Sequence, residues 1–263
     1  MSVELYRSPE HLCMLFSDLV RSDDGEAVQA NQCLIVHRGR GMLLDPGGNL
    51  TYSDLLMSMG RHCLPKDLDY LFASHADPDI VASLPRWMLN SNARVLIPSM
   101  WARFVPHFAT GRIAPERIIG VGDRGGRLRL NGAEIILLPA HYLHAEGNLQ
   151  VYDPTSKLLF SGDLGTSVLP TGLPVQPVRD FEAHVPLMLR FHTRYMVCNR
   201  ALRLWADMVE QLEIEGIVPQ HGAPLLGRGL VRAFVAWVRE LRCGTDLIDA
   251  DTYRVPPRES VVA

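Results

Sequence analysis

The chain alternates between short apolar runs, which predict buried strands, and longer amphipathic segments, which predict helices. Asn131-Gly132 lies between two such runs, and this dipeptide is a strong signal for a two-residue β-hairpin. A second hairpin is predicted around the turn at Pro154-Thr155-Ser156. Strands are predicted at 32–37, 41–45, 70–74, 128–130, 134–138, 149–152, 157–160 and 216–218.

Helices are predicted mainly in the later part of each half of the chain, at 52–61, from about 80 onward, at 181–195, at 200–213 and at 230–241. Pro85 either kinks the second of these helices or begins the next one. Strand-like and helix-like segments continue to alternate without a change in composition. We therefore expect one α/β domain over residues 1–250 and a C-terminal tail at 251–263.

Bulk properties exclude several classes of function. The chain has 263 residues, 47% of them apolar, and a net charge of −3, which argues against a nucleic-acid or anionic membrane surface. No apolar run reaches the ~18 residues of a membrane span, and the N-terminus lacks an export signal, so we expect a cytoplasmic protein. Five cysteines without a C-x-x-C pair indicate reduced, buried thiols.

Histidines and aspartates follow four of the predicted strands, and this pattern predicts a metal site. They are His75, Asp77, Asp79, His144, Asp163 and His221. Titratable groups placed just after strand ends reach one edge of a sheet, where three imidazoles and three carboxylates suit two metal ions. Spacing of i, i+2 and i+4 in extended backbone points His75, Asp77 and Asp79 the same way, and Pro78 is expected to prevent a helix there.

The order of these motifs resembles the metallo-β-lactamase superfamily, whose first motif is H-x-H-x-D-H. Asp77 and Ile80 stand where that motif has its second and last histidines. A carboxylate at the second position is similar to the flavodiiron proteins and to the stand-alone oxygen-binding di-iron proteins of that lineage. Further phrases that carry this resemblance lie at 44–48, 141–148, 151–154, 160–165, 191–196 and 219–222. The resemblance covers the chain from about Glu4 to Trp237 and implies an αββα sandwich with the site at one edge.

The resemblance also implies a cofactor of two irons, cycling between Fe²⁺ and Fe³⁺ and joined by an oxo or hydroxo bridge. It assigns His75, Asp77 and His144 to the first iron. It assigns Asp79 and His221 to the second iron, with Asp163 bridging both. Carboxylates suit iron, whereas zinc sites of this lineage prefer another imidazole at position 77.

Other polar residues have two open interpretations each. His141 falls outside the H-x-x-G-N pattern and is expected to support the site or the fold without binding metal. Asp45 either orients a ligand histidine or caps a turn. His192 and Tyr195 either line a small-molecule pocket or pack in the core. The remaining histidines have no metal-like neighbours in sequence and are expected at the surface or in the core: His11, His37, His62, His107 and His184.

A shell rich in carboxylates lowers the effective charge of its ions, which favours redox or gas-binding chemistry over hydrolysis. No flavin motif is visible, and too few residues follow Trp237 for a flavodoxin-like domain. Three hypotheses remain. In the first, the chain is a di-iron protein that binds or senses O2 and acts through a signalling partner. In the second, it reduces O2, peroxide or NO with an external electron donor. In the third, it is a dinuclear hydrolase of an ester, thioester or phosphodiester. A homo-oligomer is also expected.

Overall fold

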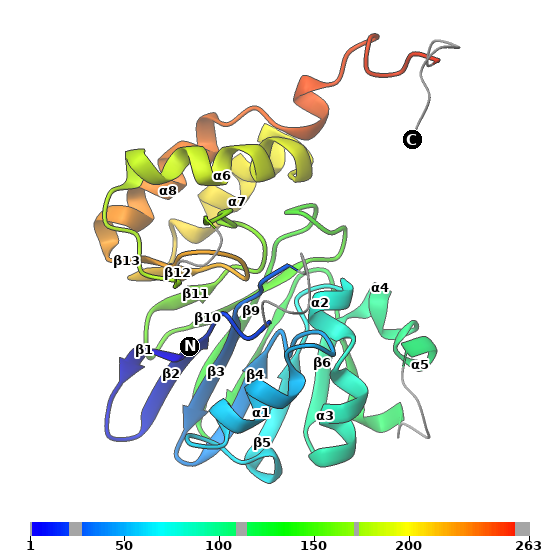
Figure 1. Cartoon of the computed structure of the whole chain (residues 1–263), viewed down its shortest axis with the longest axis vertical. Helices are drawn as coiled ribbons and strands as arrows, with labels where there is room; N and C mark the ends of the chain where they lie inside the picture. The colour runs from blue at the N-terminus through cyan, green and yellow to red at the C-terminus, as the bar shows by residue number, and fades with distance from the viewer. Residues whose placement is uncertain (1, 21–27, 109–114, 171–173, 256–263) are drawn as a thin grey trace.

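Two mixed β-sheets pack face to face, and helices cover the outer face of each (Figure 1). The computed structural model describes residues 2–20, 28–108, 115–170 and 174–255. This arrangement is the αββα sandwich predicted from the sequence. The expected C-terminal tail lies outside the described residues from position 256 onward.

The first sheet has seven strands in chain order, antiparallel from β1 to β4 and parallel from β4 to β7. They are β1 (Ser2–Arg7), β2 (His11–Phe16), β3 (Gln32–His37), β4 (Arg40–Leu44), β5 (Leu68–Phe72), β6 (Arg94–Pro98) and β7 (Ile118–Val121). Parallel pairing needs crossover connections, which the helices on this face provide. They are α1 (Tyr52–Met59), α2 (Pro78–Val81), α3 (Leu84–Asn90), α4 (Ser99–Ala102) and α5 (Val105–Phe108).

The second sheet has six strands in the order β13-β12-β11-β10-β9-β8, and only β11 and β12 run parallel. They are β8 (Gly126–Leu130), β9 (Ala133–Pro139), β10 (Leu149–Asp153), β11 (Leu158–Phe160), β12 (Gly216–Val218) and β13 (Leu225–Leu226). The outer face is covered by the long helices α6 (Phe181–Tyr195), α7 (Asn199–Val209) and α8 (Arg228–Glu240), as Figure 1 shows. Short 3₁₀ turns lie at Pro65–Asp67, Pro115–Arg117 and Gly244–Leu247.

Three apolar clusters correspond to the layers of this sandwich. One lies between the second sheet and α6–α8, around Trp205 and Phe234. Another lies between the first sheet and α1–α3, around Trp87. The third joins the inner faces of the two sheets, around Phe72 and Phe160. Strands buried on both faces read as continuous apolar runs, which explains why β3 could be found without alternation.

Two prolines begin helices, and one of them corrects an expectation. Pro85 lies in the first turn of α3, so it begins a helix and does not kink one. Pro78 is the first residue of α2, where we expected no helix. Proline is tolerated at a first helical position because the N–H that it lacks would have no intrahelical partner there. The extended backbone therefore ends at Asp77, and Asp79 lies in the first turn of α2.

Among the described residues, no helix has the length and apolarity that crossing a membrane requires.

Candidate metal centre

The predicted ligands meet where strands of both sheets end. The stretch from His75 to Asp79 follows β5 of the first sheet. The other three lie in the second sheet's loops: His144 between β9 and β10, Asp163 after β11, and His221 after β12. The sandwich therefore brings together residues that are 146 positions apart in sequence, from 75 to 221.

Three of these side chains surround a first position. Nε2 of His75 and Nε2 of His144 each lie 3.5 Å from Oδ2 of Asp77. Each of the two nitrogens also lies 3.1 Å from Oδ2 of Asp163. The donor atoms of His75, Asp77 and His144 all lie within 4.8 Å of one another, which is the spacing of ligands around one ion.

A second position lies on the other side of Asp163. Nε2 of His221 is 3.4 Å from Oδ1 of Asp163 and 3.4 Å from Oδ2 of Asp79. The two oxygens of the Asp163 carboxylate thus face two different sets of donors. This is the arrangement expected of a carboxylate shared by two ions.

Asp163 is itself nearly inaccessible, with 2% of its surface exposed. Its Oδ2 atom is buried and has no well-aligned hydrogen-bond donor among the described residues, although two imidazole nitrogens lie 3.1 Å from it. A buried carboxylate oxygen without a well-aligned partner is costly. A cation among these nitrogens and oxygens would pair it, so the residues present fit a metal centre. Nitrogen and carboxylate donors in these numbers suit iron.

The ring of His75 is oriented by the polypeptide on its far side. Its Nδ1 lies 2.9 Å from the hydroxyl oxygen of Ser74, and the backbone N–H of Ser74 donates to Oδ1 of Asp45 at 2.8 Å. Asp45 therefore supports the ligand through Ser74 and not by direct contact. Burial raises the pKa of Asp45 to about 6, and the hydrogen bond from Ser74 opposes this shift.

The ring of His221 is fixed by a backbone group from the other end of the chain. Its Nδ1 donates to the carbonyl oxygen of Gln29 at 2.7 Å, since a carbonyl can only accept. When His221 is neutral, its Nε2 therefore carries the lone pair that faces Asp79 and Asp163. Sequence reasoning missed both Gln29 and Ser74.

Electrostatics show how strongly the site concentrates negative charge. Burial alone lowers the pKa of His75, but Asp163 and Asp77 raise it to about 10. Burial also opposes protonation of His221, yet Asp163 and Asp79 raise its pKa to about 10. In turn, His221 and His75 hold the pKa of Asp163 well below its usual value, against the effect of burial. Without metal, these two imidazoles bind protons in place of cations.

An aromatic group covers the outer side of His144. The ring of Tyr195 lies 5.6 Å from the ring of His144 and stacks on Phe191 at 4.7 Å between centroids. Tyr195 is 54% exposed, so it lies between the candidate metal centre and solvent. It stays a candidate for the pocket.

His192 makes contacts of a different kind. It is fully buried, its Nδ1 donates to the carbonyl of Met188 at 2.8 Å, and its Nε2 accepts from the backbone N–H of Gly165 at 3.0 Å. Burial lowers the pKa of His192 to about 4, so the ring is neutral and can accept that hydrogen bond. Of its two predicted roles, these contacts favour the one in the core, where His192 holds the loop that carries Asp163.

The sequence predicted the surroundings of His141 better than those of His11. His141 donates from Nε2 to the carbonyl of Asp123 at 2.6 Å and makes no described contact with the six candidate ligands. This agrees with its predicted place outside the ligand set. His11 was expected at the surface or in the core, without metal-like neighbours. It is buried in the core, but its ring lies against Cys13 and Asp153, so the second part of the expectation was wrong. Asp153 is 142 positions away, so sequence spacing carried no signal of this contact.

Comparison with known proteins identifies the lineage. The sequence model of the ODP family beta lactamase matches residues 28–222. The chain belongs to this family. A structure described as the peroxy diiron species of chemotaxis sensor ODP is 36% identical, with a TM-score of 0.83, over 94% of this chain and 97% of that chain. The apo state of chemotaxis sensor ODP from T. denticola is 35% identical, with the same coverage and TM-score.

More distant relatives support the fold of this ODP-family chain. Rubredoxin oxygen:oxidoreductase from Desulfovibrio gigas has a TM-score of 0.76 and 16% identity over 90% of this chain and 61% of that chain. An uncharacterized protein of Methanocaldococcus jannaschii is 21% identical over 189 residues, which are 70% of this chain and 46% of the relative. The chain thus spans about half the length of that curated relative. The likeness to the Desulfovibrio gigas protein shows the fold alone.

Proposed function

We propose that this chain is a non-heme di-iron protein that binds or senses O2. The observation that carries the proposal is the buried carboxylate of Asp163, whose two oxygens face two separate sets of donors. Similarity to the chemotaxis sensor ODP over 94% of the chain supports the same reading. Carboxylates at positions 77 and 79 supply the negative charge that oxidised iron favours.

Each ligand has a proposed place. His75, His144 and Asp77 hold the first iron, and His221 and Asp79 hold the second. Asp163 would contribute to both positions, since its Oδ2 lies 3.1 Å from Nε2 of His75 and its Oδ1 lies 3.4 Å from Nε2 of His221. The proposed domain covers residues 1–250, and we propose that it works in the cytoplasm.

The chain's own groups prepare this site in three ways. The carbonyl of Gln29 directs the Nε2 lone pair of His221 inward. His75 and His221 release protons when metal binds, because their pKa values are about 10 without it. Tyr195 and Phe191 cover the His144 side and limit access of water. A pair of ferrous ions, once held there, can bind O2 and supply two electrons.

Two electrons reduce O2 only to the level of peroxide. We therefore propose that the chain works with a partner, either a signalling protein that responds to its oxidation state or an external electron donor. The similarity to a protein described as a chemotaxis sensor favours the signalling partner. Tyr195 and Phe191 lie between His144 and solvent, which makes this face suited to such contact.

Anaerobic purification followed by titration with O2 tests the function. We expect about two irons per chain, near-ultraviolet absorption after oxidation, and consumption of about one O2 per centre that stops without added reductant. Sustained turnover with a reductant would favour the reductase alternative. Stoichiometric zinc, no reaction with O2, and rapid hydrolysis of a lactone or thioester would refute the proposal in favour of a hydrolase.

A further inference from the structure

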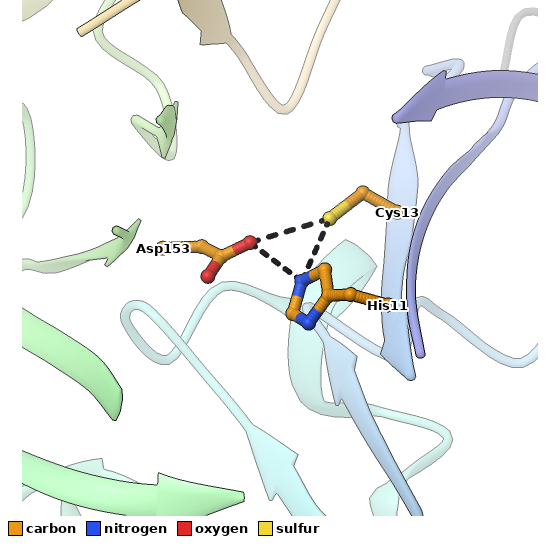
Figure 2. Close-up of side chains that lie close together, drawn as sticks. All are labelled: His11, Cys13 and Asp153. Carbon is orange, nitrogen blue, oxygen red and sulfur yellow. Dashed lines mark hydrogen bonds and ion pairs between the residues drawn. The ribbon is translucent and has the colours of Figure 1, made fainter. Parts of the chain in front are cut away.

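A second group of metal-ligand side chains lies at the other end of the sandwich. Figure 2 shows His11, Cys13 and Asp153 pointing toward one another. His11 and Cys13 lie two residues apart on β2 of the first sheet, so they share one face, and Asp153 is the last residue of β10 in the second sheet. His11 pairs in register with His37 at the end of β3, next to the start of β4, whereas the candidate iron ligands follow the far ends of β5, β11 and β12.

The spacing of the three donor atoms is close to that of a tetrahedral ion site. Sγ of Cys13 lies 3.6 Å from Nε2 of His11 and 3.5 Å from Oδ2 of Asp153. Zinc bond lengths and a tetrahedral angle give edges of about 3.5 Å for both sulfur pairs and about 3.3 Å for nitrogen to oxygen. The observed distance from His11 Nε2 to Asp153 Oδ2 is 2.8 Å, so only this edge must open, by about half an ångström.

The hydrogen bonding at Asp153 is uneven in a way that a cation would relieve. Its Oδ2 faces four donors, which are His11 Nε2, Cys13 Sγ, and both the backbone N–H and the hydroxyl of Ser156. Within the described part of the chain, its Oδ1 accepts only from the backbone N–H of Thr155. A carboxylate oxygen has two lone pairs, so four donors exceed what Oδ2 can serve well. A metal ion would replace the two donors from β2 with one bond.

Charge balances when such an ion enters. Burial raises the pKa of Cys13 well above its usual value, so its thiol is neutral without metal. With a divalent ion, the thiol proton of Cys13 leaves to solvent, and neutral His11 binds the ion through its Nε2 lone pair. The charges of 2+ on the ion and 1− on each of Cys13 and Asp153 sum to zero. All three side chains are at most 2% exposed, where a net charge would be prohibitive.

A neighbouring histidine holds the ring of His11 in the orientation that ligation needs. Nδ1 of His11 lies 3.2 Å from Nδ1 of His37. A neutral His37 with its proton on Nε2 can accept a hydrogen bond at Nδ1. His11 can then donate from Nδ1 and present the Nε2 lone pair to an ion, as ligand histidines commonly do.

We propose that His11, Cys13 and Asp153 bind one divalent cation of the zinc class, apart from the di-iron centre and independent of its function. One thiolate, one imidazole and one carboxylate form a donor set that zinc accepts. The hydroxyl of Ser156, which contacts both Asp153 and Cys13, is placed to approach the fourth position. Because the ligands come from β2 and β10, the ion would join the two sheets directly.

Metal content of the full-length protein tests this proposal. Protein expressed with iron and zinc supplements should contain about one zinc per chain in addition to iron. Cys13→Ser should lose the zinc and keep the iron, and Asp163→Ala should lose the iron and keep the zinc. This crossed pair separates failure of the zinc site from failure of the di-iron centre. Iron in Cys13→Ser also reports that the variant folds.

Cobalt supplies a second, spectroscopic readout. The ligands are buried, so the wild-type chain is unfolded and refolded with Co²⁺. A thiolate-to-cobalt charge-transfer band is expected, because the six candidate iron ligands include no cysteine. Cys33→Ser is the matched control, since Cys33 is a buried thiol of the same inter-sheet core and should not affect the band. No band in the wild type, or a band that survives Cys13→Ser, would overturn the proposal and leave a hydrogen-bonded link between the sheets.

Discussion

Replacing Asp163 with alanine should remove both irons from the protein. The side chain is 2% exposed, and its Oδ2 lies 3.1 Å from the imidazoles of His75 and His144 while its Oδ1 lies 3.4 Å from His221. Each proposed metal position therefore loses a carboxylate in a single substitution. The second position keeps only His221 and Asp79.

The size of the effect follows from what the carboxylate does. Loss of an outer partner that merely orients a ligand weakens metal binding ~10–100-fold. Asp163 is proposed as a ligand to both ions, so each affinity should fall by more than ~100-fold. The pKa values of His75 and His221 should also fall without this carboxylate, which reduces proton competition at the two imidazoles but does not replace the lost ligand. The variant should consequently be purified with almost no iron.

Iron per chain, measured after anaerobic purification and gel filtration, is the assay. His141→Ala is the control, because this histidine only donates to the carbonyl of Asp123 and should keep most of the metal. Circular dichroism establishes whether both variants fold. Equal metal loss in the two variants, or two irons retained by folded Asp163→Ala, would refute the assignment of Asp163 as the shared ligand.

Three further predictions concern the same region. Asp77→His should shift metal content from iron toward zinc, measured on protein grown with both metals, since an added imidazole suits zinc; an unchanged ratio would contradict this. Loading the metal-free protein with Fe²⁺ at pH 8 should release about two protons, because His75 and His221 have pKa values of about 10 and are protonated at pH 8. Metal affinity should therefore rise with pH. A pH-stat measurement that detects almost no released protons would contradict this prediction. His192→Ala should reduce the free energy of unfolding by about 1–3 kcal/mol in a urea titration, because the N–H of Gly165 loses its acceptor; no change would mean that water replaces the ring.

Local patterns in the sequence, together with the family resemblance that they carry, located the proposed metal centre. The four motifs each place a histidine or aspartate within a few residues of a strand end, and strand ends at one edge bring such residues together. Short stretches of sequence likewise predicted the Asn131-Gly132 turn and the helix at 181–195, and both occur as predicted. Helix α7 was expected to reach 213 but ends at Val209. The expectation was too long because apolar residues continue beyond the end of the helix.

Contacts between distant segments could not be predicted in this way. The carbonyl that orients His221 belongs to Gln29, 192 positions away, and a backbone carbonyl leaves no mark in a sequence. The contact of His11 with Asp153 depends on how two sheets pack, which no motif records. Strands β1, β2, β6 and β7 were also not assigned. The half-exposed pattern of β1 resembles that of a loop, whereas the apolar runs in β2 and β6 are typical of buried strands.

The split of the metal centre between two sheets has a consequence for synthesis of the chain on the ribosome. All four groups proposed around the first iron, the last of them Asp163, leave the ribosome before His221 does. Synthesis delivers the N-terminal part of the chain first. His221 can reach the carbonyl of Gln29 only after β12 has emerged and paired with β11, so the second metal position is completed last. The two irons should therefore be acquired in sequence, and a nascent chain halted before residue 216 should hold at most one.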